Sequence, residues 1–252
     1  MRKSAGEEID LIRPDETLDD LVRGGLKVLQ HRKGYRFSID SVLLAHFAEA
    51  RTDDKVMELG CGSGVVSILI AARQPACEII GLEIQPALAD MARRSIELNG
   101  LSDSIKVIHG DLRNPEVFLP KKKFSLVVAN PPFWKMGEGK GNKDEENHIA
   151  RHETQATLED FINRAGSLLA VKGRLIMIHR AARIAEIMEL CSRESLYLRR
   201  VRFVYPRSGA DANLVLIEAQ KGKKSETKVL SPLIVYGEDR KYTEEIMNIY
   251  FG

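Results

Sequence analysis

The sequence predicts an α/β fold with a doubly wound, mostly parallel central sheet. From residue 55 onward, short apolar runs alternate with segments that have helical periodicity. Nearly continuous apolar runs are typical of strands buried on both faces of a parallel sheet, and a helix between consecutive strands makes them parallel. At 252 residues with 44% hydrophobic content, the chain is long enough to bury a substantial core.

The main region, residues 51–252, supplies the predicted elements in order. The first four strands are KVMEL, EIIGL, SIKVIH and FSLVVA, beginning at residues 55, 78, 104 and 124. Helices follow the first two strands, over 65–73 and 86–99, and the second has helix punctuation in Pro86 and Asn99-Gly100. After a polar segment come a helix over 158–169, the strand RLIMIH, a helix over 182–194, and closing strands over 198–205 and 214–219.

Residues 1–50 are predicted to form an N-terminal appendage that packs on this main domain. Glycine turn signals separate short apolar stretches over 18–37, which indicates a small hairpin. Ser38 then offers an N-cap hydroxyl to a short helix, because apolar residues from Ile39 to Phe47 recur at helical spacing.

Composition excludes several classes of protein. The N-terminus MRKSAGEEIDL is charged where a signal peptide requires an apolar stretch, and the longest apolar run, 65–72, is too short to span a bilayer. We therefore expect a soluble, cytoplasmic protein that has no membrane partner. The net charge of +2 is nearly neutral, so any contact with nucleic acid requires a local basic patch.

The three cysteines, Cys61, Cys77 and Cys191, are scattered along the chain and include no CxxC pair. Their odd number and wide spacing argue against a disulfide framework and against structural zinc. We expect no metal site. Cys61 lies within a glycine loop, where a small residue is needed.

That glycine loop, Glu58 to Gly64, follows the first strand directly and opens into a helix. Gly60, Gly62 and Gly64 permit a tight turn and a close approach of the backbone to a ligand, although G-x-G-x-G departs from the dinucleotide pattern G-x-G-x-x-G. Glu83 ends the second strand, where a carboxylate can accept hydrogen bonds from both hydroxyls of a ribose. The alternative is a structural glycine turn with a solvated acid.

The loop ELGCGSG, Glu83 and Asp111, each after a successive strand, closely resemble the corresponding positions of the class I S-adenosylmethionine-dependent methyltransferases. The resemblance covers about residues 55–220 and implies S-adenosylmethionine as cofactor and a seven-stranded sheet whose last pair forms an antiparallel edge. The family's roles, carried over to this sequence, assign the methionine part to the glycine loop with Glu58 and Cys61, the ribose to Glu83 with its neighbour Ile84, and the adenine to Asp111 and Leu112.

The fourth strand is followed by Asn130-Pro131-Pro132-Phe133. The Asn130 side-chain oxygen and the Pro131 carbonyl can both accept hydrogen bonds from one NH2 group, which directs its nitrogen toward an electrophile. Two prolines fix the backbone, so the acceptors need little reorganisation, and Phe133 can stack on a planar base. A methyl sulfonium requires no general base before attack, and we find no Ser/His/Asp or metal constellation.

This motif resembles that of amino-group methyltransferases, which include adenine-N6, ribosomal guanine-N2 and release-factor glutamine-N5 enzymes. Two further segments, 34–45 and 205–218, resemble the bacterial tRNA adenine-N6 methyltransferases that modify a valine tRNA. That resemblance implies a tRNA substrate and gives Arg36, Phe37 and Asp40 as candidate contacts, with Asp40 and Asn130 also expected to bind the cofactor. Arg207 and Lys135 lie on loops that should share the catalytic edge of the sheet, and they are candidates for contact with RNA phosphates.

Several alternatives stay open at this point. Guanine-N2 and glutamine-N5 methylation use the same motif, although glutamine enzymes usually carry a larger helical N-terminal domain. A non-catalytic RNA-binding protein could share the fold, but the intact motifs argue against it. We expect the polar segment 135–147 to be a mobile part of the substrate entrance, and interpret His179, at a strand end, as a satisfied structural residue. Oligomeric state is not indicated.

Overall fold

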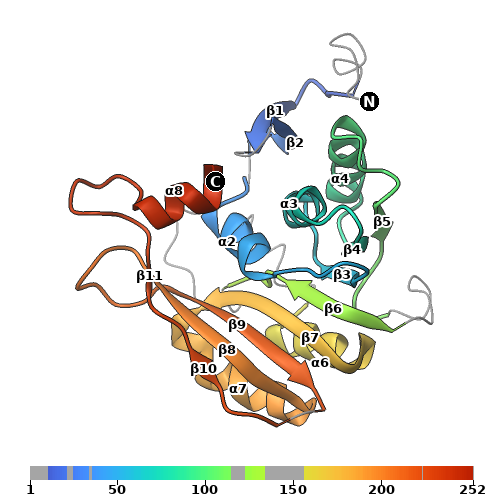
Figure 1. Cartoon of the computed structure of the whole chain (residues 1–252). Coiled ribbons are helices and arrows are strands. Elements are labelled where there is room, and N and C mark those ends of the chain that lie inside the picture. Colours follow the sequence, from blue (N-terminus) through green and yellow to red (C-terminus); the bar gives the residue numbers. More distant parts are fainter. Residues whose placement is uncertain are drawn as a thin grey trace.

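The computed structural model describes residues 11–21, 25–33, 36–114, 123–133, 156–222 and 224–251, and its centre is one large sheet (Figure 1). The strands are β3 (Lys55–Leu59), β4 (Glu78–Glu83), β5 (Ile105–His109), β6 (Phe124–Ala129), β7 (Leu169–Arg180), β8 (Leu196–Tyr205), β9 (Leu214–Lys221), β10 (Lys228–Val229) and β11 (Leu233–Ile234). Their order is β10-β8-β9-β7-β6-β3-β4-β5, with β11 also paired to β8. All pairs are parallel except those of β9, which confirms the predicted fold class.

The sheet adds two details to the seven strands that the resemblance implied. Within the described residues it has nine strands, because β10 and β11 extend it past β8. Two-residue strands are too short to show any periodicity in the sequence. The antiparallel strand β9 lies between β7 and β8 rather than at the edge. Apolar patterning identifies a strand but does not specify its neighbours.

Helices cover both faces of the sheet. α2 (Ile39–Phe47), α3 (Val65–Arg73) and α4 (Pro86–Leu98) lie on one face, and α6 (Leu158–Leu168) and α7 (Ile184–Arg193) lie on the other (Figure 1). Successive strand residues point to opposite faces, so Val56 packs with the first group of helices and Met57 with the second. Because both faces are covered at the centre of the sheet, most residues of β3, β4 and β6 are apolar and buried. The C-terminal helix α8 (Glu244–Phe251) packs beside α2.

Helix ends follow the sequence signals with one exception. α4 begins at Pro86 and is capped by Asn99, and Thr157 and Asp160 form a reciprocal capping box at the start of α6. Ser38 occupies the N-cap position of α2, as predicted, but its hydroxyl makes no capping hydrogen bond. Its Oγ is instead buried without a partner among the described residues.

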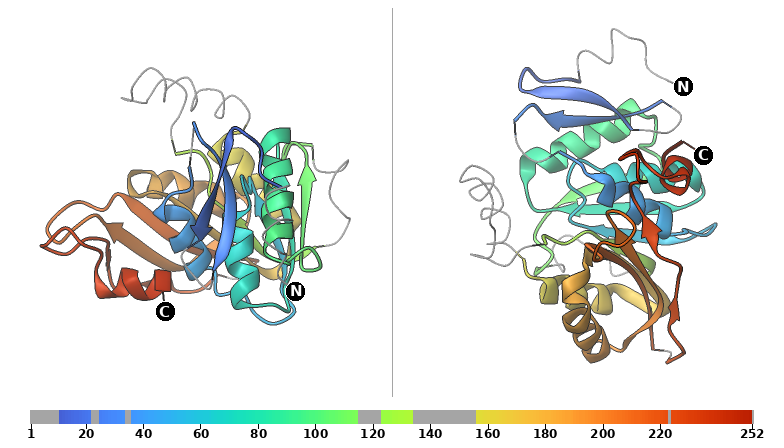
Figure 2. Two further views of the ribbon diagram at one scale, coloured as in Figure 1. Left: turned by 90° about the horizontal axis from the view of Figure 1, so that it is seen from above. Right: turned by 90° about the vertical axis from the view of Figure 1, so that its left-hand side faces the viewer.

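The predicted hairpin consists of β1 (Glu16–Leu21) and β2 (Leu26–His31), and it lies against α4 (Figure 2). Leu29 packs with Met91 and Leu98 of that helix. By contrast, α2 belongs to the main core. The division of the chain into residues 1–50 and 51–252 stays a prediction.

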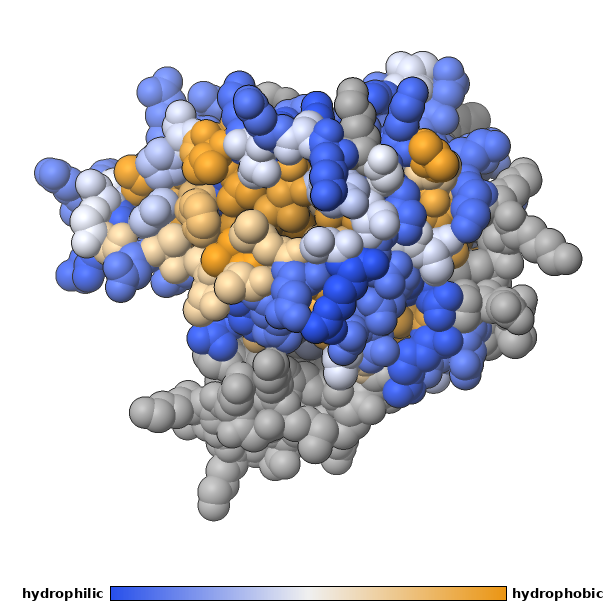
Figure 3. Space-filling view, turned by 90° about the horizontal axis from the view of Figure 1, so that it is seen from below, coloured by the Kyte–Doolittle hydropathy of each residue, from blue (hydrophilic) through white to orange (hydrophobic). Residues whose placement is uncertain are grey.

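The underside of the molecule, on the side of α6 and α7, carries a patch of apolar side chains bordered by charged ones (Figure 3). Met188 of α7 and Val229 of β10 are large apolar residues with more than half of their surface exposed. None of the helices in the described part of the chain is long and apolar enough to cross a membrane.

Candidate active site

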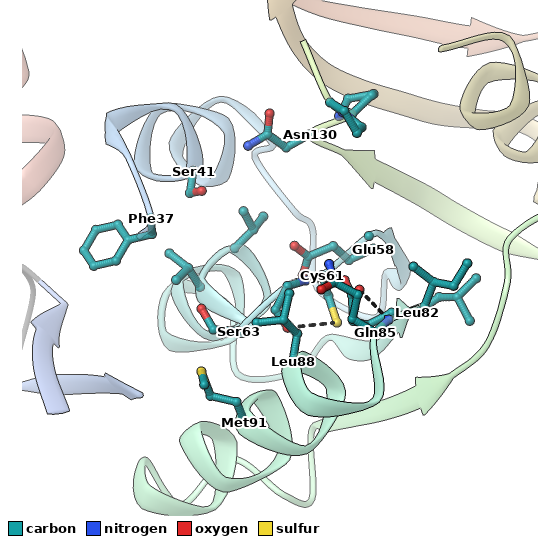
Figure 4. A pocket seen from close by; sticks show the side chains of 18 of the residues that line it. Phe37, Ser41, Glu58, Cys61, Ser63, Leu82, Gln85, Leu88, Met91 and Asn130 are labelled. Atoms are coloured by element: carbon teal, nitrogen blue, oxygen red, sulfur yellow. Dashed lines mark hydrogen bonds between the residues drawn. The ribbon is translucent and has the colours of Figure 1, made fainter. Parts of the chain in front are cut away.

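The loops that carry the sequence motifs meet where the strand order of the sheet reverses. The chain passes from β3 outward to β4 and β5, then returns to the other side of β3 with β6. Such a reversal opens a crevice at the carboxyl ends of the strands, where open α/β sheets bind ligands. A cavity of about 510 Å³ lies here, with side chains from the glycine loop, α4 and the segment after β6 arranged around it (Figure 4).

The cavity brings together most of the predicted site residues. Its wall includes, from the predicted set, Asp40, Glu58, Gly60, Cys61, Gly62, Glu83, Ile84, Asp111, Leu112, Phe37 and the whole segment Asn130 to Phe133. These residues come from five separate stretches of sequence. A cavity of this size falls within the range that takes a cofactor-sized ligand.

Backbone geometry explains the glycines of the loop. Gly60, Gly62 and Gly64 all have positive φ, at 71°, 53° and 89°, a region in which side chains with a Cβ are strained. The N–H groups of Gly60 and Cys61 donate to the carbonyl of Leu82, which ties the loop to β4. Gly64 is the N-cap of α3 and does not line the cavity.

Glu58 lies beneath this loop and reaches the first turn of α3. Its Oε2 accepts hydrogen bonds from the Ser67 N–H, at 3.0 Å, and from the Ser67 hydroxyl. Gly64 has no side chain with which to cap the helix, so Glu58 supplies the missing acceptor. Burial raises the pKa of Glu58 to about 8. The side chain therefore has a structural partner besides its place in the cavity wall.

Cys61 is a buried residue of the loop itself. Burial, followed by the nearby carboxylates of Glu58 and Glu83, raises the pKa of the Cys61 thiol well above its usual range. A Cβ added to Gly81 of β4 would lie 2.8 Å from the Cys61 sulfur, so these two residues fit only as a pair. Cys61 is thus a packing residue with the properties of an inert thiol.

Glu83 joins the glycine loop to the start of α4. Its Oε2 accepts from the Gly62 N–H and its Oε1 from the Gln85 N–H, both at 2.9 Å. Each carboxylate oxygen can accept a second hydrogen bond, so both oxygens remain available to a pair of neighbouring hydroxyls. Burial raises the pKa of Glu83, and the backbone N–H groups oppose that rise.

Asp111 follows β5 at the far side of the cavity and already has a partner. Both of its carboxylate oxygens contact the Arg113 guanidinium, the closer at 2.5 Å, and hydrogen bonds from Arg113 lower the pKa of Asp111. Asp111 is therefore ionised at neutral pH. A ligand amine that bound it would share the carboxylate with Arg113.

The segment after β6 presents an unpartnered acceptor. The Oδ1 of Asn130 is buried and has no hydrogen-bond partner among the described residues, while Asn130 itself lines the cavity. An unsatisfied buried acceptor costs about 1 to 3 kcal/mol, so native proteins rarely keep one without a functional reason. Phe133, at the end of the segment, packs against His179 with ring centroids 5.3 Å apart.

The N-terminal region supplies wall residues that the sequence did not identify. The cavity also includes Gln30, His31 and Lys33 at the end of the hairpin. Gln30 is buried, and its Oε1 accepts from the Phe37 N–H at 2.7 Å, which fixes the residue beside the cavity. No motif marked these side chains, because they reach the site only through the docking of the hairpin on α4. Burial raises the pKa of Asp40, which lies at the start of α2.

The remaining predicted contacts lie elsewhere. Arg36 does not line the cavity, and its guanidinium binds Asp19 of β1. Arg207 is exposed in the loop between β8 and β9, outside the cavity wall. The register of Arg180 with Leu214 nevertheless sets this loop at the same sheet edge as Asn130. Lys135 and the segment 135–147 lie outside the described residues.

Two basic residues of β8 are engaged in ion pairs. Arg200 binds Glu218 and Glu49, and Arg202 binds Glu245. Over the described ranges, no three His, Cys, Asp or Glu side chains gather where they could hold a metal ion.

Comparison with known proteins agrees with this geometry. Residues 38–194 match the family model described as methyltransferase small domain. A tRNA1(Val) (adenine(37)-N6)-methyltransferase from the Flavobacteriaceae bacterium strain 3519-10 is 25% identical over 78% of this chain and 81% of its own length. A protein of the same name from Porphyromonas gingivalis is 32% identical over 60% of this chain and 61% of its own.

Solved structures show the same architecture. A predicted O-methyltransferase from Agrobacterium tumefaciens superposes with a TM-score of 0.68 at 25% identity, covering 84% of this chain and 95% of that one. TrmN from Thermus thermophilus gives a TM-score of 0.51 at 22% identity over 72% of this chain and 48% of its own. The family match covers α2 and the strands and helices from β3 to α7, which include the glycine loop, Glu83 and Asn130. The chain therefore belongs to the methyltransferase small domain family and has its Rossmann-like fold.

Proposed function

We propose that this chain is an enzyme that transfers a methyl group from S-adenosylmethionine to the exocyclic N6 of an adenine in tRNA. One observation carries the proposal: the unpartnered Asn130 Oδ1 lines the same cavity as the glycine loop and Glu83. The names of the similar proteins support tRNA adenine as the acceptor. A cytoplasmic location is part of the proposal, because the substrate is tRNA.

The donor set fits the cofactor. The free acceptor positions of Glu83 suit the two ribose hydroxyls, and the left-handed glycine turn lets the backbone approach the methionine portion without a Cβ in the way. Leu112 and Ile84 offer apolar walls for an adenine ring, with Asp111 as an acceptor for its amine. S-adenosylmethionine, when bound, supplies an electrophilic methyl group.

The residues after β6 act on the amino group that receives the methyl. Asn130 Oδ1 and the Pro131 carbonyl accept its two N–H bonds, which aims the nitrogen lone pair at the methyl carbon. Formation of the N–C bond would break the methyl–sulfur bond and release the cofactor as a neutral thioether. The extra proton on the nitrogen, held by these same oxygens, would then pass to solvent water. Phe133 stacks on the base, which must leave its own stack to reach the cavity.

The substrate RNA extends past the cavity, and we propose that Arg207 and Lys135 contact its phosphates. Arg207 suits this role because it is exposed at the sheet edge that carries Asn130. Arg36 suits it less, since its guanidinium is bound by Asp19. Phe37 and Asp40 remain candidates for contact with the ligands in the cavity.

The proposal predicts a large loss of activity in Asn130→Ala. Labelled S-adenosylmethionine is incubated with undermodified tRNA, ribosomal RNA and release factor, and the methylated product is identified by mass spectrometry. We expect N6-methyladenine in tRNA, formed at least about 100-fold more slowly by Asn130→Ala, because a preorganised acceptor is lost at the transition state. Cofactor affinity, measured by calorimetry, should change little.

Asn248→Ala is the matched control, since this amide is exposed on α8 and does not line the cavity. It should retain normal activity. Label in guanine or in a protein amide would retain the chemistry and reject the adenine assignment. Cofactor binding without label in any of the three substrates would reject the proposed acceptor classes together.

A further inference from the structure

His179 is a fully buried polar residue that lies directly behind the amino-acceptor segment. It is the penultimate residue of β7, and Met177 of that strand pairs with Ala129, the residue before Asn130. The side chain has 0% exposed surface and does not line the cavity. Of its two ring nitrogens, Nδ1 has a hydrogen-bond partner, whereas Nε2 is buried without one among the described residues.

Hydrogen bonding fixes the tautomer of the ring. His179 Nδ1 accepts a hydrogen bond from the Arg180 N–H at 2.8 Å, so the neutral ring carries its proton on Nε2. Burial, followed by the positive charge of Arg183, lowers the pKa of His179 to about 4. At neutral pH the side chain is therefore an uncharged donor that points away from its own strand.

Two contacts direct this ring at the acceptor segment. The Pro132 carbonyl is the backbone acceptor that favours the protonated ring, although Nε2 does not reach it with full hydrogen-bond geometry. The imidazole also packs against Phe133 at a centroid distance of 5.3 Å and an angle of 53°, a tilted arrangement that aromatic pairs prefer. His179 thus contacts Pro132 and Phe133, which line the cavity, without lining it itself.

We infer that His179 is a positioning residue, which supports Pro132 and Phe133 from behind so that the stacking ring and the Asn130 acceptor keep their relative placement. Through Phe133 it acts on the target base, without touching substrate or cofactor itself. This inference rests on the proposed function for its kinetic consequences and on the ring's own contacts for its structure.

Two substitutions distinguish the contribution of the aromatic ring from that of the Nε2 proton. His179→Phe keeps an aromatic ring against Phe133 and removes the Nε2 proton, whereas His179→Gln keeps a donor near Pro132 and removes the ring. In single-turnover methylation of tRNA, we expect each variant to lose about 10- to 100-fold in rate, as misplacement of a reacting group by about 1 Å does. Cofactor affinity should stay within about two-fold of the unmodified protein. The pH dependence from 6 to 8 should keep its shape, because the ring does not titrate there.

Cys191→Ala is the control for general destabilisation, since Cys191 on α7 is equally buried and lies in the core cluster that includes Met177 of β7. A rate loss in the His179 variants no greater than in Cys191→Ala would reject the positioning role. A change in the shape of the pH profile would reject it in favour of proton transfer.

A second measurement does not depend on the substrate. Nitrogen-15 NMR of the histidine rings should show His179 as the Nε2-protonated tautomer from pH 5.5 to 8, with its Nε2 proton signal shifted in Phe133→Leu. If tRNA is not methylated but these signals appear, the proposed function fails and the placement of His179 stands. A ring protonated on Nδ1 would overturn the placement itself.

Discussion

Two buried carboxyls, Glu58 and Glu83, flank the glycine loop, and they have different hydrogen-bond partners and different roles. Glu83 accepts a backbone hydrogen bond on each oxygen, from Gly62 and from Gln85, whereas Glu58 directs Oε2 at the N-terminus of α3. Both pKa values are raised by burial. The loop is therefore held by groups whose charge depends on pH.

Glu58 makes the stability of the protein pH-dependent near neutrality. The pKa of Glu58 is about 8 in the folded state, against an ordinary value of 4.5. As the pH rises, the unfolded chain therefore releases this proton at a lower pH than the folded chain does. The favourable contribution of protonated Glu58 is complete below about pH 4.5 and is lost as the pH rises through 8. Without cofactor, the free energy of unfolding of the parent protein should fall between pH 5 and pH 8 by about 2 to 4 kcal/mol more than that of Glu58→Gln.

Denaturant unfolding at several pH values measures this difference. Glu78→Gln provides the control, because that carboxyl is exposed at the start of β4. A gap between Glu58→Gln and the parent that stays constant across the range would contradict the raised pKa.

Among the elements, the β1–β2 hairpin reaches the cavity only through its attachment to α4. Arg94 of α4 forms two hydrogen bonds of 2.6 Å with the carboxylate of Glu16, which is buried at 2% side-chain exposure. Ser95 and Asn99 of the same helix bind the backbone of β2 at Leu29 and Lys27. The placement of Gln30 and Phe37 beside the cavity depends on this attachment.

Arg94→Ala should release the hairpin while leaving the central sheet intact. Removing one partner of a buried ion pair costs about 3 to 5 kcal/mol, because Glu16 loses the guanidinium that compensates its charge and retains the Arg13 N–H as a donor. Hydrogen exchange of the β1 and β2 amides should become at least about 100-fold faster, whereas exchange in β3 and β6 should stay unchanged.

Arg93→Ala serves as the comparison for the hairpin experiment, since the Arg93 guanidinium donates to the Val107 carbonyl on the side of β5. It should leave hairpin exchange unaltered. Equal acceleration of exchange in all the strands of Arg94→Ala would show that the hairpin and the sheet unfold as one unit.

For the molecule as a whole, the residues that could be predicted from the sequence are those whose place depends only on their position along a strand. Glu83 and Asn130 were found because each ends a buried apolar run, and parallel strands bring those ends to one edge. The insertion of β9 between β7 and β8 was not visible, because strand neighbours are chosen by tertiary packing. Gln30 was missed because its place beside the cavity depends on a hydrogen bond from Phe37, outside its own strand. Arg36 was assigned to substrate because its ion pair with Asp19 of β1 has no signal in the sequence.

The cavity wall draws on β3, β4, α2, the segment after β6 and the hairpin, so a ligand bound there links elements that are distant in sequence. S-adenosylmethionine at 100 times its Kd should therefore stabilise the folded chain by about 2.7 kcal/mol. For a protein of this size that corresponds to a rise in Tm of about 5 to 10 °C. The rise can be measured by differential scanning calorimetry.

Glu83→Gln should lose most of this rise at the same cofactor concentration, because an amide cannot offer an acceptor to both ribose hydroxyls while also accepting the Gly62 and Gln85 N–H groups. Glu78→Gln should keep the rise in full. The isosteric amide preserves the volume in the wall, so a Tm without ligand close to that of the parent would show that the loop still folds. If Glu83→Gln then responded to cofactor as the parent does, the ribose would have to be held by other residues of the cavity, and the assignment of Glu83 would be withdrawn.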